Sequence, residues 1–155
     1  MVISSLIIIL TLLFFFGILE NYYHNKALAK IPIRIHVNGA RGKSSVTRLI
    51  AAGLRAGGIV TMGKTTGSAP RIIDKEGRDL IIHRLRSASI GEQVKLIRNF
   101  SKKKIEALVI ECMAVQPQYQ WIAEQKMIKS TISVITNIRP DHLDEMGISI
   151  DQITK

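Results

Sequence analysis

A glycine-rich turn between an apolar run and a helical pattern is the feature that most constrains how this chain can fold. Residues 33–47 read Ile-Arg-Ile-His-Val-Asn-Gly-Ala-Arg-Gly-Lys-Ser-Ser-Val-Thr. The β-branched residues favour a strand, and the apolar spacing after the turn favours a helix over 44–56. Gly39 and Gly42 can adopt backbone angles closed to other residues, and they allow a ligand to approach the chain closely. Strand, turn and helix in this order predict an anion site at the turn.

The two residues after the second glycine add phosphate chemistry to this turn. Lys43 can offer its charge to the β- and γ-phosphates of a nucleotide, and the hydroxyl of Ser44 can bind Mg²⁺. A Walker A loop also requires a glycine five residues before Gly42, where this chain has Val37. The short pattern therefore also fits a turn that precedes Lys-Ser by coincidence. The flanking strand and helix favour the nucleotide site.

Length, charge and cysteine content bound the classes of protein that fit. A chain of 155 residues is enough for one core and little more. The net charge of +10 comes with few aromatic residues and no nucleic-acid motif, and the run at 102–104 fits a solvated helix end better than a nucleic-acid patch. A basic surface also suits anionic lipid or an anionic substrate. The single cysteine, Cys112, excludes an internal disulfide framework.

The N-terminus carries an uncharged apolar run over residues 2–19. As a helix it would be roughly 27 Å long, enough to span a hydrocarbon core. A cleaved signal peptide is the alternative, but its positive n-region is missing. The run is followed by the basic residues Lys26, Lys30 and Arg34. Their position predicts a protein of the cell membrane whose N-terminus lies outside and whose body lies in the cytoplasm. We expect a single-pass anchor at 1–20, a linker at 21–30 and one domain at 31–155.

The remaining pattern predicts an α/β domain built on a parallel sheet. Strands are expected at 31–37, 59–62, 105–110 and 130–136, with a hairpin at 71–74 and 80–83 and helices at 90–104 and 117–127. His36 and Cys112 are interpreted as packed residues, and Trp121 as a core or interface residue. The segment 63–71 is read as a loop whose small, hydroxylated and basic residues suit a carboxylate or phosphate.

Polar residues follow two of the expected strands, at the sheet edge where ligands bind in open α/β folds. Glu111 comes directly after a buried strand and is a candidate Mg²⁺ ligand, with a structural ion pair as the alternative. Asn137 and Asp141 to Asp144 follow the last strand. His142 can bind a cation or a phosphate oxygen, or it is an ordinary surface histidine.

Taken together, these motifs resemble the Mur ligase superfamily of ATP-dependent amide ligases. Its short Gly-x-x-Gly-Lys-Ser/Thr loop accounts for Val37, its second signature matches Glu111, and its third, Asn-x-x-x-Asp-His-x-Asp, matches residues 137–144. Within the superfamily, the segments at 38–44, 63–67, 90–93 and 111–115 together with the apolar N-terminus resemble the ligase subunits of poly-γ-glutamate synthases of the capsule-biosynthesis type. The predicted fold is therefore an N-terminal transmembrane helix followed by part of a P-loop-type parallel-sheet Mur ligase ATPase domain.

The resemblance implies ATP and Mg²⁺ as cofactors and a set of site residues. The nucleotide would be bound by Asn38, Gly39, Ala40, Arg41, Gly42, Lys43, Ser44, Ser45 and Asn137. Ser44, Glu111 and His142 would hold metal ions, and Lys43 and His142 would act in catalysis. The acceptor carboxylate would meet the loop residues Lys64, Thr65, Thr66 and Arg71. The reaction implied is γ-amide formation between glutamates through an acyl phosphate.

The resemblance also implies partners and a longer chain. Glutamate, the growing poly-γ-glutamate chain, other membrane subunits of the synthase and the membrane itself are expected partners, and nucleic acid is not. Further ATPase strands, a carbamylated lysine and a C-terminal domain would follow Lys155, so we expect an N-terminal fragment that is inactive as an isolated ligase. A membrane-tethered nucleotide-binding module and a lipid-docking interaction protein are the alternatives.

Overall fold

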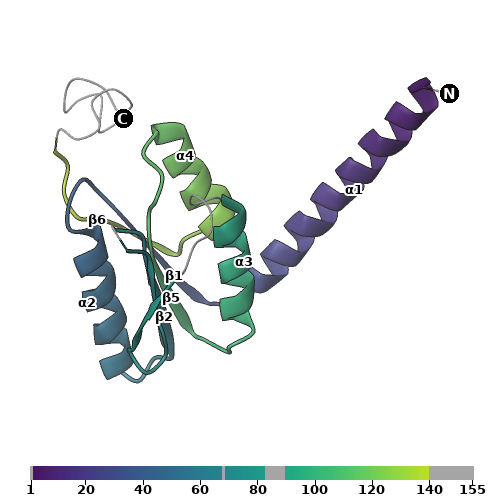
Figure 1. Ribbon diagram of the computed structural model, residues 1–155. Coiled ribbons are helices and arrows are strands. Elements are labelled where there is room, and N and C mark those ends of the chain that lie inside the picture. The colour runs from purple at the N-terminus through teal and green to yellow at the C-terminus, as the bar shows by residue number, and fades with distance from the viewer. Residues whose placement is uncertain (1, 68, 83–89, 140–155) are drawn as a thin grey trace.

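The chain forms an open sheet with helices on both faces (Figure 1). The computed structural model describes residues 2–67, 69–82 and 90–139. The sheet has six strands in the order β4-β3-β2-β5-β1-β6. The strands are β1 (Ile33–Asn38), β2 (Thr61–Thr65), β3 (Arg71–Ile73), β4 (Asp79–Ile81), β5 (Ala107–Glu111) and β6 (Ile132–Ile135). β2, β5, β1 and β6 run parallel, and β3 and β4 form the expected antiparallel hairpin. The predicted α/β class with a parallel sheet is confirmed.

Two hydrophobic clusters, one on each face, hold the helices to the sheet. The helices are α1 (Val2–Leu28), α2 (Lys43–Ala56), α3 (Ile90–Ser101) and α4 (Pro117–Ile122), and α4 continues into the π-helical turn η1 (Ala123–Ile128). α2 covers one face, and α3 and α4 lie on the other (Figure 1). In β5, Val109 belongs to the α2 cluster, whereas Leu108 and Ile110 belong to the cluster that contains residues of α3. Alternation along a strand sends neighbouring side chains to opposite faces, so one short strand serves both cores.

The second strand differs from its sequence-based boundaries. β2 begins at Thr61 and runs to Thr65, so Gly63, Lys64 and Thr65 lie in a fully buried strand rather than in the expected loop. The strand pairs with β5 on one side and with β3 on the other. Two neighbouring strands supply main-chain partners that outweigh the weak strand preference of this polar sequence.

The tryptophan, expected in the core or at an interface, is exposed. Trp121 is 57% exposed, so it does not lie in the core of this chain. It stands on the short helix α4, none of whose residues is buried, and Lys126 lies over its ring at 5.3 Å from the centroid. Periodicity could not reveal this, because α4 gives way to a π-helical turn at Ala123 and the 3.6-residue repeat ends there.

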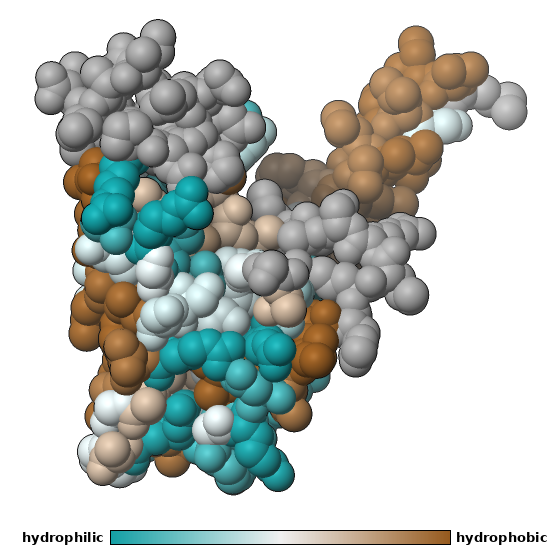
Figure 2. Space-filling view, turned by 60° about the vertical axis from the view of Figure 1, so that its left-hand side comes forward, coloured by the Kyte–Doolittle hydropathy of each residue, from teal (hydrophilic) through white to brown (hydrophobic). Residues whose placement is uncertain are grey.

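The N-terminal helix is continuous with the folded body. α1 is long and apolar enough to cross a membrane, and its exposed part projects as an apolar rod (Figures 1 and 2). It extends to Leu28, so most of the segment expected as a linker at 21–30 is helical. His24, Ala27 and Leu28 are buried, and His24 Nε2 lies 2.6 Å from the carbonyl oxygen of Met127. The last turns of α1 are therefore packed as part of the domain.

Candidate phosphate-binding site

The turn between β1 and α2 folds into a compact loop with two glycines in positive-φ conformations. Gly39 has φ = 126°, and Gly42 has φ = 81° as the residue that caps α2. A Cβ at Gly39 would lie 2.2 Å from Thr136 Oγ1, whereas a Cβ at Gly42 would meet open space. Position 39 thus requires glycine because of its positive φ and because Thr136 lies so close. Position 42 requires glycine because of its positive φ alone.

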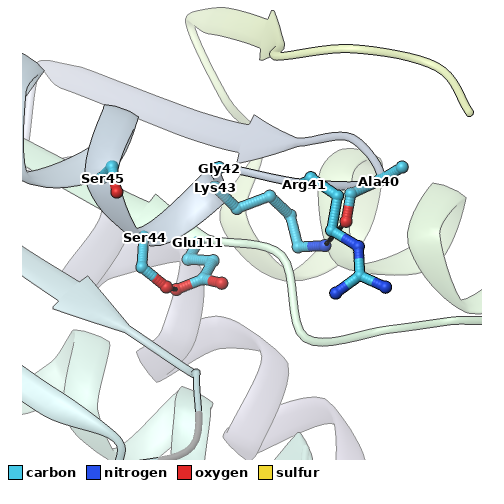
Figure 3. Close-up of a pocket in the computed structure, with 7 residues that line it drawn as sticks. All are labelled: Ala40, Arg41, Gly42, Lys43, Ser44, Ser45 and Glu111. Atoms are coloured by element: carbon cyan, nitrogen blue, oxygen red, sulfur yellow. Dashed lines mark hydrogen bonds between the residues drawn. The ribbon is translucent and has the colours of Figure 1, made fainter.

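A pocket of about 250 Å³ opens beside this loop (Figure 3). Its lining consists of Ala40, Arg41, Gly42, Lys43, Ser44, Ser45 and Glu111. Because an α-helix leaves its first N–H groups without intrahelical acceptors, the start of α2 presents backbone donors here, together with the positive end of the helix dipole. The pocket therefore combines helix amides with cationic and hydroxyl side chains, a donor set suited to phosphate.

The lysine side chain bends back over the loop. Lys43 Nζ donates to the carbonyl oxygen of Gly39 at 2.6 Å, and it lies 3.4 Å from that of Ala40. Figure 3 shows the ammonium group and the Arg41 guanidinium on the same side of the loop. A lysine held by carbonyl oxygens can exchange them for phosphate oxygens by rotation of its side chain, because both are acceptors.

Ser44 and Glu111 meet at the inner end of the pocket, where β5 ends beside the start of α2. Ser44 Oγ donates to Glu111 Oε2 at 2.8 Å (Figure 3). The same carboxylate oxygen accepts the backbone N–H of Thr66 at 2.7 Å. A Cβ at Gly67 would lie 3.2 Å from Ser44 Oγ, so the segment after β2 closes over the pair. Two hard oxygens are thus held together at a buried carboxylate.

Asn38 and Asn137, both expected to bind nucleotide, are engaged in contacts within the protein. Asn38 Nδ2 donates to Gln120 Oε1 at 2.6 Å, and its Oδ1 accepts the N–H of Gly39 at 2.8 Å. Asn137 Oδ1 accepts the N–H of Arg41 at 3.1 Å, and Asn137 Nδ2 donates to the carbonyl oxygen of Arg41 at 2.9 Å. Both side chains contact the protein rather than line the pocket.

The residues expected to meet the acceptor lie in different environments. Lys64 and Thr65 are buried in β2, and Arg71 Nη1 lies 3.8 Å from Asp79 Oδ2. Thr66 reaches the pocket through its backbone N–H to Glu111. His142, expected to bind a metal ion and to act in catalysis, lies outside the described residues, as do Asp141 and Asp144.

Behind the loop, a buried histidine contacts an acidic residue that sequence reasoning did not identify. His36 is packed, as expected, and its Nδ1 pairs with Glu124 Oε2. Burial lowers the pKa of His36, and the contact with Glu124 offsets only part of that shift. Burial alone would raise the pKa of Glu124, but hydrogen bonds from Ser130, Ser133 and His36 hold it below its usual range. The π-helical turn that carries Glu124 left no periodic signal by which to predict this contact.

The cysteine is packed as expected. Burial raises the pKa of the Cys112 thiol, which disfavours the reactive thiolate at neutral pH.

Comparison with known proteins gives sequence and structural relatives. The Mur ligase middle domain matches residues 37–155. The chain is 43% identical over 147 residues to "Capsule biosynthesis protein CapB" of Bacillus anthracis, an alignment that covers 92% of this chain and 31% of that protein. It is 40% identical over 152 residues to "PGA synthase CapB" of Bacillus subtilis strain 168, which covers 97% and 39% respectively. The chain spans about a third of the length of these relatives.

A solved structure shares the fold. Escherichia coli FolC in complex with ADP, without folate substrate, is similar with a TM-score of 0.55 at 15% sequence identity. The match covers 84% of this chain and 35% of that chain. At this identity the likeness concerns the arrangement of helices and strands alone.

Proposed function

This chain belongs to the Mur ligase family, and on that premise we propose that it carries the ATP-binding part of an amide ligase that makes γ-glutamyl bonds in poly-γ-glutamate capsule synthesis. The observation that carries the proposal is the pocket in which Lys43, the Ser44–Glu111 pair and the N-terminus of α2 converge. The names of the two relatives, capsule biosynthesis protein and PGA synthase, support the choice of polymer.

ATP is proposed to bind with its phosphates at the N-terminus of α2. The backbone N–H groups of the first helical turn would donate to phosphate oxygens, and the helix dipole favours the negative charge. Lys43 would leave the carbonyl oxygens of the loop and pair with the β- and γ-phosphates. Arg41 lines the same pocket and would add a second cation on the γ-phosphate side.

The Ser44–Glu111 pair fits Mg²⁺ by its donor chemistry. Mg²⁺ prefers oxygen ligands, and neighbouring ligands of an octahedral ion at about 2.1 Å lie about 3 Å apart. Ser44 Oγ and Glu111 Oε2 are 2.8 Å apart, so both can bind one ion without a large movement. The ion supplies charge neutralisation for the phosphates when bound.

The proposed reaction has two steps. A carboxylate oxygen of the acceptor glutamate attacks the γ-phosphorus, ADP leaves and an acyl phosphate forms. The amine of the next glutamate then attacks the acyl carbon, and inorganic phosphate leaves as the amide bond forms. Both reactants in the first step are anions, so positioning and fixed positive charge provide most of the catalysis. Lys43 and the helix amides would supply that charge.

His142 is proposed to bind a second cation between the γ-phosphate and the acceptor, and the segment from Lys64 to Arg71 is proposed to bind the acceptor carboxylate. Of that segment, Arg71 is the side chain best suited to a carboxylate, because it is partly exposed and its guanidinium can bind a carboxylate through two parallel hydrogen bonds. Lys64 is buried in β2, so its contribution would require the β2 end to rearrange.

α1 is proposed to anchor the chain in the cell membrane with its N-terminus outside and the pocket in the cytoplasm. Its length and apolar composition permit a span, and basic residues lie only after the span. Other membrane subunits of the synthase would be its partners, and the growing polymer its acceptor substrate.

The test has two stages with one pair of variants. In detergent, the chain should bind Mg-ATP, and Lys43→Ala should weaken binding by at least about tenfold, whereas Lys75→Ala in the exposed β3–β4 turn should leave it unchanged. In membranes that carry the complete synthase, Lys43→Ala should abolish glutamate-dependent ADP release. Equal binding by both variants would refute the phosphate site. Binding without glutamate-dependent turnover would instead favour a tethered nucleotide-binding module.

A further inference from the structure

The side chain of Asn137 links the end of β6 to residues 39–42 between β1 and α2, which we call the phosphate loop. This carboxamide makes two hydrogen bonds with one residue, because its Oδ1 accepts the N–H of Arg41 and its Nδ2 donates to the carbonyl oxygen of Arg41. The two distances are 3.1 Å and 2.9 Å. The hydroxyl of Thr136 donates to the same carbonyl oxygen at 2.7 Å. The side chains of two residues therefore hold the peptide groups on both sides of Arg41.

Backbone contacts extend this attachment. The parallel pairing of β1 with β6 reaches Asn38, whose carbonyl oxygen accepts the N–H of Thr136 at 2.9 Å. Beyond it, the carbonyl oxygen of Asn137 accepts the N–H of Ala40 at 3.0 Å. The approach is close enough that a Cβ at Gly39 would collide with Thr136. The first half of the loop is thus bonded to β6 as an extension of the sheet.

These hydrogen bonds determine which backbone N–H groups can donate to a phosphate. The N–H groups of Ala40 and Arg41 point to Asn137 and are already used. The N–H groups of the first turn of α2 have no intrahelical acceptor, and the residues that carry them line the pocket. The loop therefore sets the position of the site, and the start of α2 supplies the N–H donors. Small shifts of such a loop weaken ligand binding strongly, because bound geometry must be kept within fractions of an ångström.

We infer that Asn137, supported by Thr136, is a positioning residue that holds the phosphate loop, and that it does not itself contact the nucleotide. The inference deepens the proposed function and rests on it. A residue that acts through the loop must weaken the binding of every phosphate ligand, by a larger factor where Arg41 also contacts the γ-phosphate. A residue that touches only the base or only the γ-phosphate must leave the affinity unchanged for a ligand that lacks that group.

The experiment measures binding of Mg-ATP, Mg-ADP and inorganic tripolyphosphate to the full chain in detergent. Asn137→Ala should weaken all three, each by about fivefold to thirtyfold, the value expected for two lost hydrogen bonds. Thr136→Val should weaken all three less, and Thr136→Ser, which keeps the hydroxyl, should bind as the wild-type chain does. A loss confined to one or two of the ligands, or no loss, would overturn the inference.

A matched control lies at the other end of the same strand. Thr131 Oγ1 accepts the N–H of Arg34 at 2.9 Å and lies 3.1 Å from the carbonyl oxygen of Arg34, so it pairs β6 with β1 much as Thr136 pairs it with the loop. Thr131→Val should lower thermal stability and leave all three affinities unchanged. If Thr131→Val weakens binding as much as Asn137→Ala does, the effect is general destabilisation and the inference fails.

A second readout does not need a ligand. Residue-resolved amide hydrogen exchange should show the Arg41 N–H protected in the wild-type chain and exposed in Asn137→Ala, with Thr131→Val unchanged. Fast exchange in the wild-type chain would overturn the positioning role even if nucleotide binds. Protection of Arg41 without binding of any of the three ligands would refute the proposed function and, with it, the role of Asn137 in ligand binding.

Discussion

Ser44 Oγ lies 2.8 Å from Glu111 Oε2, although the two residues are 67 positions apart in the chain. The contact joins the start of α2 to the end of β5, and it forms because β1 and β5 are parallel neighbours in the sheet. Their C-terminal ends therefore meet at one edge, where the loop turns into α2. A hydroxyl and a carboxylate are thereby held as neighbouring oxygens at the pocket.

The Ser44–Glu111 pair predicts how nucleotide affinity depends on magnesium. The wild-type chain should bind ATP more tightly with Mg²⁺ than with a chelator, and Glu111→Gln should remove most of that difference, because an amide oxygen is a weaker ligand for a hard cation. Titration of ATP with and without Mg²⁺ measures this. Glu106→Gln is the control, since Glu106 also accepts a backbone N–H, from Val60 at 2.9 Å, but next to the opposite end of β5. A full magnesium effect in Glu111→Gln would exclude Glu111 as a ligand.

The two loop glycines should differ in their tolerance of a methyl group. Gly42→Ala meets open space and carries only the strain of φ = 81°, so it should cost about 1–2 kcal/mol in unfolding free energy. Gly39→Ala adds a collision with Thr136 and should cost more and weaken ATP binding further. Denaturant unfolding and nucleotide titration of both variants check this. Equal costs would mean that the contact with Thr136 relaxes freely.

Arg41 should favour the triphosphate over the diphosphate. Its guanidinium lies on the same side of the loop as the Lys43 ammonium (Figure 3), where a terminal phosphate would add negative charge. Arg41→Gln should weaken Mg-ATP by about fivefold to tenfold and Mg-ADP much less. Arg48→Gln is the control, because Arg48 pairs with Asp79 at 2.6 Å and does not line the pocket. An unchanged ratio of the two affinities in Arg41→Gln would contradict this role.

The last turn of α1 should contribute to the stability of the domain. Leu28 is 3% exposed and belongs to the cluster that contains residues of α3 and η1, so Leu28→Ala should cost about 2–5 kcal/mol. Leu13 lies on the same helix but is 63% exposed in the apolar rod, so Leu13→Ala should not change the unfolding of the body. Thermal unfolding of both variants in detergent distinguishes them. Similar melting temperatures would show that α1 is an appendage of the domain.

Stability should fall on acidification because of His36. Its pKa is lowered in the folded chain from an ordinary value of 6.5, so the unfolded chain takes up the proton first as the pH falls. Stability is therefore present above that value and is lost as the pH falls below it. The depressed pKa of Glu124 acts in the same direction, lower on the pH scale. The melting temperature should drop between about pH 7.5 and pH 5.5, and less steeply in His36→Gln. An identical pH dependence in both proteins would remove His36 as the cause.

Much of the architecture followed from local pattern. The strand, turn and helix around Gly39 and Gly42 were predicted within a residue or two, because β-branched residues, glycines and a 3.6-residue repeat act over short distances. The apolar N-terminal helix and the β3–β4 hairpin followed for the same reason. β2 was misplaced toward the N-terminus, because its polar residues are held in the sheet by two neighbouring strands rather than by their own preference.

The residue types of the candidate site were also predicted from the sequence, but their contacts within the protein were not. Lys43, Ser44 and Glu111 lie together at the pocket as expected. Asn137, expected to bind nucleotide, contacts the backbone of Arg41, a contact that the sequence did not predict. Lys64 was expected in a loop and is buried in a strand. The chemistry of a side chain follows from its residue type, whereas its partner depends on which distant backbone group packs against it.

The sequence by itself determined the α/β class, the glycine turn, the apolar helix and the chemical character of the residues after each strand, because these depend on near neighbours along the chain. The tertiary structure alone decided that α1 continues into the core, that His36 meets Glu124, and that Thr136 and Asn137, which follow β6, contact the loop between β1 and α2. Each of these contacts joins segments about 90 or more residues apart. No local pattern encodes such a pairing, since it is set by strand order and by the packing of both faces of one sheet.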